Sequence, residues 1–135
     1  MVCVYCKQKT YVVNSRHFKK INITWRRRTC KNCQAIFSTK EWVDLGSSLR
    51  VSSSSGELTE FLRDKLFISV YLSLLHRKTA LTDAMGLADT IIGKILTNTS
   101  KGLVNTTEIR QITSEVLGRF DKVSSTYYLA HNQVS

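Results

Sequence analysis

Two Cys-x-x-Cys pairs decide the fold of the first third of the chain: 3-CVYC-6 and the second pair in 26-RRRTCKNC-33. Each pair can form a tight turn that presents two thiolates from one side, and two such turns complete a tetrahedral site. The 23 intervening residues suit a strand–turn–strand excursion that returns the second pair to the first. We therefore predict a zinc ribbon over residues 1–45, with one Zn²⁺ held by Cys3, Cys6, Cys30 and Cys33.

Four thiolate ligands close the coordination sphere, and this indicates a structural ion. A catalytic zinc keeps one position open for water. Redox-active cysteine pairs and a rubredoxin-like iron site are the alternatives, but no thioredoxin-type βαβ pattern surrounds either pair. The three histidines are scattered, and the cysteines are committed to metal. We predict that the protein is not an enzyme.

Positive charge is concentrated in the cysteine-bearing part of the chain. Residues 1–50 contain eleven Lys/Arg and two Asp/Glu, whereas residues 51–135 contain nine and eight. This asymmetry favours a polyanion-binding module attached to a near-neutral module with another role. The chain lacks a signal-peptide pattern and an apolar run long enough to span a membrane, so we expect a cytoplasmic protein.

The basic residues fall on segments with β-type composition, which are 10–14, 21–28 and 35–45. Along the second segment, alternation directs Trp25 and Arg27 to one side of a strand. Arg26 and Arg28 then point to the other side. An arginine-rich β-ribbon suits phosphates and guanine edges, so we predict nucleic-acid binding. The residues alone do not choose between DNA and RNA.

The rest of the chain has helical spacing after a serine-rich stretch at 46–56, which we interpret as a linker or a weak hairpin. We predict a helix of roughly 19 residues from Leu58, and a second one from Leu81 to Leu96. A third follows the capping sequence at Asn105, and 123–129 adds a short fourth. The fold class is α+β, a small β zinc ribbon followed by an α-rich domain over 57–135.

Four motifs in one order carry a family resemblance: Cys3-Val-Tyr-Cys6, Val13-Asn14-Ser15-Arg16, Arg26-Arg27-Arg28-Thr29-Cys30-Lys31-Asn32-Cys33 and Phe37-Ser38-Thr39-Lys40-Glu41. Together they resemble the NrdR family, bacterial transcriptional repressors of ribonucleotide reductase genes. Residues 57–78 are similar to the first helix region of the family's ATP-cone domain. The sequence Asp121-Lys122-Val123 is similar to the motif before its last helix.

The resemblance implies a two-module repressor. Its zinc ribbon would bind double-stranded DNA upstream of reductase operons, and its cone would bind ATP or dATP and set the state of a homo-oligomer. With the lysines near the metal site included, the candidate DNA-binding residues are Arg16, Arg26, Arg27, Arg28, Lys31 and Lys40.

The cone-like region departs from the family pattern. Ser53 stands at the position of a family lysine, and Glu60 stands at that of a proline. The candidate nucleotide-binding residues are Ser53, Ser54, Ser55, Gly56 and Lys65. A hydroxyl is a weaker phosphate partner than a cation, so an oligomerisation domain without nucleotide sensing is an alternative. The alternative for the whole chain is an RNA- or ribosome-associated zinc-ribbon adaptor.

Overall fold

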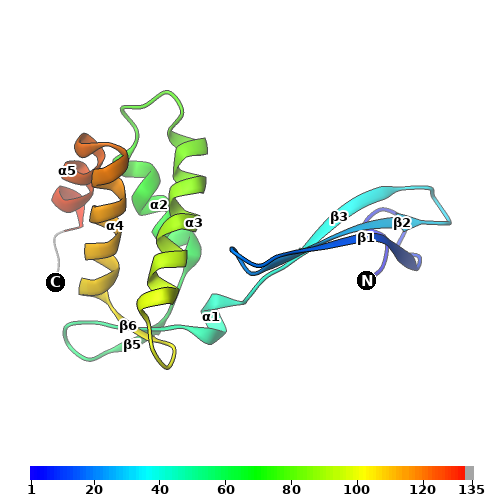
Figure 1. Cartoon of the computed structure of the whole chain (residues 1–135), viewed down its shortest axis with the longest axis horizontal. Helices are drawn as coiled ribbons and strands as arrows, with labels where there is room; N and C mark the ends of the chain where they lie inside the picture. The colour runs from blue at the N-terminus through cyan, green and yellow to red at the C-terminus, as the bar shows by residue number, and fades with distance from the viewer. Residues whose placement is uncertain (133–135) are drawn as a thin grey trace. The chain divides into compact units, whose positions relative to one another are not determined.

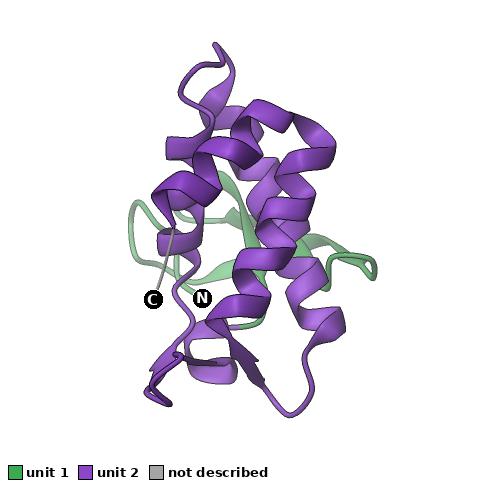
Figure 2. Ribbon diagram, turned by 90° about the vertical axis from the view of Figure 1, so that its left-hand side faces the viewer, with its two compact units in different colours: residues 1–43 green, residues 44–135 purple. Residues whose placement is uncertain are grey.

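The computed structural model describes residues 1–132 and divides into two compact units, Met1–Val43 and Asp44–Ser135. Figure 2 colours the two units separately. The first is a β-structure that contains the cysteines, and the second is mainly helical, which confirms the α+β class. Among the described residues, no helix is long and apolar enough to cross a membrane.

Unit 1 is a three-stranded antiparallel sheet in the order β1-β2-β3. Its strands are β1 (Thr10–Phe18), β2 (Ile23–Cys30) and β3 (Ile36–Glu41), drawn in blue to cyan in Figure 1. Each of the three β segments expected from the sequence contains a strand, but the third strand ends at Glu41 and the expected segment end, Leu45, begins a helix instead. β1 extends to Phe18 because the hairpin continues to the pair Phe18 and Ile23.

Unit 1 has almost no apolar core. Of its residues only Cys3, Thr10 and Cys30 are buried. A module of this size without a core needs another source of stability, and a bound structural metal is one such source.

Unit 2 combines a small sheet with helices (Figure 1). The sheet order is β5-β4-β6, in which β4 pairs antiparallel with β5 and parallel with β6. Its elements are α1 (Leu45–Ser48), β4 (Arg50–Ser52), β5 (Leu58–Glu60), α2 (Arg63–Ser73), α3 (Ala80–Asn98), β6 (Leu103–Asn105), α4 (Thr106–Phe120) and α5 (Lys122–His131).

The helix predicted from Leu58 begins later than expected, which corrects the sequence interpretation. Leu58–Glu60 forms β5, because its backbone groups are satisfied by pairing with Arg50–Ser52. The amide of Phe61 then donates to the carbonyl of Leu49 at 3.1 Å, and α2 starts at Arg63. The stretch 46–56 thus spans part of α1, the strand β4 and the turn that leads to β5.

The other helices follow their sequence signals. In α4 the side chain of Asn105 accepts from the amide of Glu108 at 2.8 Å, and the carboxylate of Glu108 accepts from the amide of Asn105 at 3.1 Å. This capping box satisfies two amides that a helix start would leave unpaired. The core between the helices and the sheet contains Leu49, Phe61, Leu66, Val70, Leu74, Ala84, Ile91, Ile95, Val104, Val116, Leu117 and Tyr128.

Candidate metal centre and nucleic-acid interface

The first cysteine pair lies in a tight turn closed by two backbone hydrogen bonds. The amide of Cys3 donates to the carbonyl of Gln8 at 2.8 Å, and the amide of Lys7 donates to the carbonyl of Cys3 at 3.1 Å. Lys7 adopts a φ of 62°, the left-handed region that few non-glycine residues occupy. This conformation reverses the chain directly after Cys6.

The second pair repeats the same turn. The amide of Cys30 donates to the carbonyl of Ala35, and the amide of Gln34 donates to the carbonyl of Cys30, both at 2.9 Å. Gln34 has a φ of 63°, and it follows Cys33 directly. Two turns of one geometry therefore present their thiols to a common point.

The four sulfur atoms form a compact cluster. The Sγ of Cys3 lies 3.6 Å from that of Cys33, the Sγ of Cys6 lies 3.5 Å from that of Cys30, and all four lie within 4.8 Å of one another. A tetrahedron with Zn–S bonds of about 2.3 Å has S···S edges of about 3.8 Å. The separations exceed a disulfide bond of about 2.05 Å. The donor set and its spacing fit a structural Zn²⁺.

The surroundings of the thiols already favour negative charge at one side of the cluster. The pKa of the Cys6 thiol is lowered to about 6, and the largest cause is a hydrogen bond from the backbone amide of Gln8. The amide of Ala35 also lowers the pKa of Cys33, but burial and the other thiols outweigh it and raise the pKa to about 12. Neighbouring thiolates repel one another, and a divalent cation would remove that repulsion.

The strand register sorts the basic residues between the two faces of the sheet. Arg16 lies opposite Trp25, which lies opposite Lys40, and these three side chains share one face. The next row on that face is Asn14, Arg27 and Ser38. We call this the cationic face, and it comprises Asn14, Arg16, Trp25, Arg27, Ser38 and Lys40. Every member except Trp25 is exposed.

A β-bulge makes this arrangement possible. Val12 pairs with Arg28, but Asn14 pairs with Arg27, so one residue of β1 has no opposite partner. The extra residue shifts the alternation of β1 by one. Without it, Asn14 and the residues that follow would lie on the other face.

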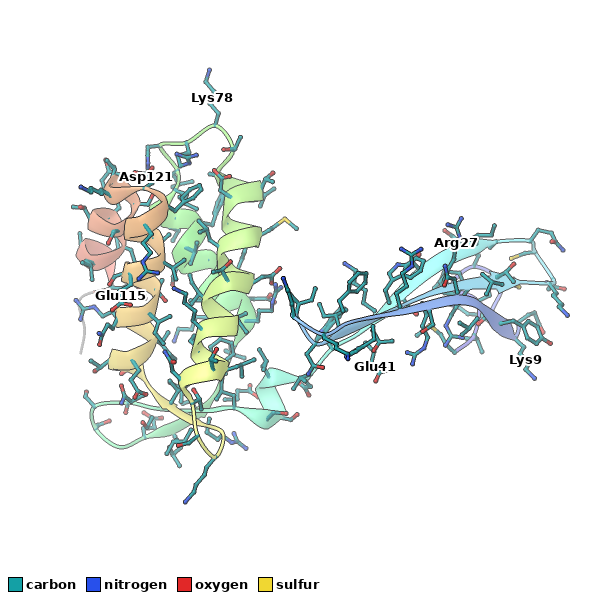
Figure 3. The ribbon with its side chains drawn as sticks, in the orientation of Figure 1. Lys9, Arg27, Glu41, Lys78, Glu115 and Asp121 are labelled. Carbon is teal, nitrogen blue, oxygen red and sulfur yellow. The ribbon has the colours of Figure 1, made fainter. Side chains whose placement is uncertain are left out.

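The opposite face carries Arg26 and Arg28, and both have partners within the unit. Arg26 donates through Nη1 to Glu41 at 2.8 Å, and Arg28 donates to the hydroxyl of Thr10 at 3.3 Å. Glu41 is the single carboxylate side chain in residues 1–43. Figure 3 shows Arg27 and Glu41 on opposite sides of the ribbon.

Lys31 extends the cationic face toward the metal centre. Its Nζ lies 4.7 Å from the centre of the Tyr11 ring, and Nζ of Lys9 lies 5.5 Å from the same ring. Tyr11 pairs with Thr29, one row beyond the row of Arg27. Of the six candidate DNA-binding residues, four therefore lie on or beside this face and two on the other. Sequence reasoning missed Lys9, whose signal was its proximity to an exposed tyrosine.

Unit 2 contains a cavity of about 470 Å³ beside the start of α4. Two of the five candidate nucleotide-binding residues, Ser54 and Lys65, line it. Ser53, Ser55 and Gly56 do not. The hydroxyl of Ser53 instead lies 2.8 Å from that of Ser55, and these residues shape the turn between β4 and β5.

Two further basic residues, Arg110 and His131, line the same cavity and were not predicted. The buried Nε of Arg110 has no hydrogen-bond partner among the described residues. Arg110 falls between Ile109 and Ile112, so the available signal was a cation beside the apolar side of α4. His131 comes from the end of α5, and only the fold brings it near Lys65.

Comparison with known proteins finds a family model that matches unit 1 and relatives that cover most of the chain. Residues 1–41 match the family model described as "Transcriptional repressor NrdR-like, N-terminal domain". A protein of Streptococcus uberis named "Transcriptional repressor NrdR" is 31% identical over 125 residues, which cover 92% of this chain and 75% of the relative. A protein of the same name from Psychrobacter cryohalolentis is 31% identical over 119 residues, 87% of this chain and 72% of the relative. The names describe repressors, a non-enzymatic role.

Proposed function

The chain belongs to the NrdR family of transcriptional repressors, and we propose that it is a zinc-dependent repressor that binds double-stranded DNA through unit 1. The observation that carries the proposal is the junction of the thiol cluster with the cationic face. Both cysteine turns border the strands whose exposed side chains are Arg16, Arg27 and Lys40. A metal-stabilised sheet of this kind is a rigid support for phosphate contacts.

Zinc held by Cys3, Cys6, Cys30 and Cys33 supplies folding free energy rather than chemistry. Structural zinc in small modules contributes on the order of 10–16 kcal/mol apparent at neutral pH. Because unit 1 buries so little apolar surface, its DNA contacts depend on that contribution. Removal of the metal should therefore remove DNA binding.

The charge of unit 1 supports a polyanionic partner. Residues 1–43 contain ten Lys/Arg and one carboxylate. Cations that neutralise phosphates release condensed counterions, and the logarithm of the affinity falls with the logarithm of the salt concentration by about 0.9 per contact. Repression follows if the bound protein occupies the promoter.

We extend the proposal to the target and the ligand of unit 2. The targets are ribonucleotide reductase genes, and the cavity that contains Lys65, Arg110 and His131 binds ATP or dATP. Its cations suit phosphate groups, and about 470 Å³ is within the range of small-ligand sites. The nucleotide would alter repression only by binding one assembly of a homo-oligomer more tightly than the others.

The direct test measures binding of the full chain to duplex DNA by fluorescence anisotropy. The probe is the region upstream of the source organism's reductase genes, compared with a shuffled duplex and a structured RNA of equal length. We expect preference for the upstream duplex, loss of binding with a zinc chelator, and a change in affinity with ATP or dATP. Equal binding to both duplexes, with tighter binding to RNA, would favour the adaptor instead.

A variant of the unit 2 cavity tests nucleotide binding separately from DNA binding by unit 1. Arg110→Gln should weaken the ATP or dATP effect while leaving zinc-dependent DNA binding intact. Lys94→Gln, which changes the same charge elsewhere in unit 2, is the matched control. An unchanged nucleotide effect in Arg110→Gln would place the ligand outside this cavity.

A further inference from the structure

The two faces of the unit 1 sheet differ in a way that assigns roles to individual basic residues. Resting on the proposed DNA-binding function, we propose that the cationic face lies in the major groove, where Arg27 reads a base edge and Arg16 and Lys40 hold phosphates on the two sides. Arg26 and Arg28, on the other face, bind partners within unit 1 and do not contact DNA.

The position of Arg27 on the central strand supports base readout. β2 lies between β1 and β3, so its outward side chains stand at the middle of the face. The partners of Arg27 across the sheet, Asn14 and Ser38, are both shorter than arginine. Arg27 is therefore the most protruding group of its row. A guanidinium in that position can donate two hydrogen bonds to O6 and N7 of guanine.

In the neighbouring row the long cationic side chains lie on the two edge strands rather than on the central strand. Arg16 on β1 and Lys40 on β3 flank Trp25. Neighbouring strands lie about 4.8 Å apart, which separates the two edge residues by about 10 Å at the backbone. The major groove is about 12 Å wide, and both side chains can splay outward. One cation thus reaches each wall of phosphates while the centre faces the bases.

The partners of Arg26 and Arg28 within unit 1 argue against the same role for the opposite face. Arg26 is already bound to Glu41, and that carboxylate would lie against the phosphates if this face contacted DNA. Arg28 is half-buried and donates to the neutral hydroxyl of Thr10, so it is held within the unit although its charge is not balanced. On the cationic face no carboxylate is present among the described residues. Electrostatics therefore favours the face with Arg27.

The test compares adjacent arginines of one strand. The probe is the duplex that the wild-type chain enriches from a random-sequence library, with a shuffled duplex as reference. Arg27→Gln should lower the ratio of the two affinities by about tenfold or more, because one bidentate base contact is lost. Arg26→Gln removes the same charge from the opposite face. It should leave the affinity ratio within about twofold of wild type and the salt slope within about 0.3 of the wild-type slope.

Edge variants test the phosphate assignment. Arg16→Gln and Lys40→Gln should each weaken binding to both duplexes equally and make the salt slope shallower by about 0.9. Lysine variants guard against misfolding, because Arg26→Lys keeps the ion pair with Glu41. Arg27→Lys should still lose sequence preference, since an ammonium cannot bind guanine as a fork. Zinc content and circular dichroism are measured for every variant.

Two outcomes would overturn the inference in distinguishable ways. If the Arg26 variants lose as much preference as the Arg27 variants, the face assignment is wrong although the protein binds DNA. If the wild-type chain enriches no sequence, the proposed function itself fails, and this inference fails with it.

Discussion

The guanidinium of Arg26 lies 2.8 Å from the carboxylate of Glu41, two residues on different strands of unit 1. The pair lies on the face opposite Arg27, the next residue along β2. Adjacent arginines in one sequence motif therefore have different electrostatic environments. Arg27 is exposed and has no carboxylate near it on its own face, whereas the charge of Arg26 is balanced.

Glu41→Gln tests how much the ion pair between Arg26 and Glu41 contributes to stability and to DNA affinity. Because Glu41 is exposed and Arg26 is only half-buried, the unfolding free energy should change by less than about 1 kcal/mol. Affinity for any duplex should rise at low salt, since a negative charge is removed, and should return to the wild-type value at high salt, where screening is strong. Anisotropy titrations at several salt concentrations measure this. A loss of affinity at low salt would contradict it.

Cys30→Ser should abolish zinc binding and unfold unit 1. The ion's contribution, on the order of 10–16 kcal/mol, far exceeds what three buried residues can supply. The helices of unit 2 form a separate core, so the helical circular dichroism signal should persist. Zinc content by elemental analysis checks the first point. Thr29→Ser, the neighbouring substitution, should retain one zinc per chain.

Gln34 tests the turn geometry that presents the thiols. Its φ of 63° disfavours a β-branched residue by about 1–2 kcal/mol, but glycine adopts it readily. Gln34→Val should therefore release zinc to a chelator faster than Gln34→Gly. Both variants lose the side-chain hydrogen bond to the carbonyl of Lys31, so this contact cancels in the comparison. Equal release rates would show that the turn is not strained.

Asp121 links the stability of unit 2 to pH. The hydrogen bond from His76, at 2.8 Å, is the largest factor that lowers the pKa of this carboxyl from 3.8 to about 2. A carboxyl whose pKa is lower in the folded state stabilises the fold above its unfolded pKa. That contribution is lost as pH falls from about 3.8 through about 2.

Urea titrations between pH 5 and pH 2 measure this dependence. Asp121→Asn should lose stability at pH 5 and show a shallower acid dependence. Asparagine can still cap α5 through Oδ1, so the change removes the charge and the Oδ2 acceptor that faces His76 while it keeps the cap. Asp89→Asn, at an exposed ion pair with Arg63, should keep the wild-type profile.

Leu49 tests whether the segment before β4 is part of the fold of unit 2. Its side chain is 2% exposed, although it lies in the serine-rich stretch interpreted as a linker or hairpin. Leu49→Ala should lower the unfolding free energy by about 2–5 kcal/mol. Leu58→Ala, at a 61% exposed position, should have little effect. Thermal unfolding of both variants decides between a packed segment and a free linker.

The sequence alone predicted the features that depend on local spacing. The cysteine intervals predicted two turns with a shared ligand point, and the alternation in β2 separated Arg27 from Arg26 and Arg28. The sequence after Asn105 predicted the start of α4, which its capping box confirms. Each of these signals is contained within a few neighbouring residues, where covalent geometry and backbone hydrogen bonding decide the outcome.

Tertiary structure decided what depends on pairing between distant segments. The spacing at Leu58 is compatible with a helix, but pairing with Arg50–Ser52 makes it a strand. Lys65, Arg110 and His131 meet at one cavity only because three helices pack together. The bulge after Val12 places Arg16 beside Trp25, and the register of β3 adds Lys40 to that row. Such contacts form when packing between distant segments compensates the entropy cost of loop closure. The spacing of neighbouring residues does not predict which distant segments will pack together.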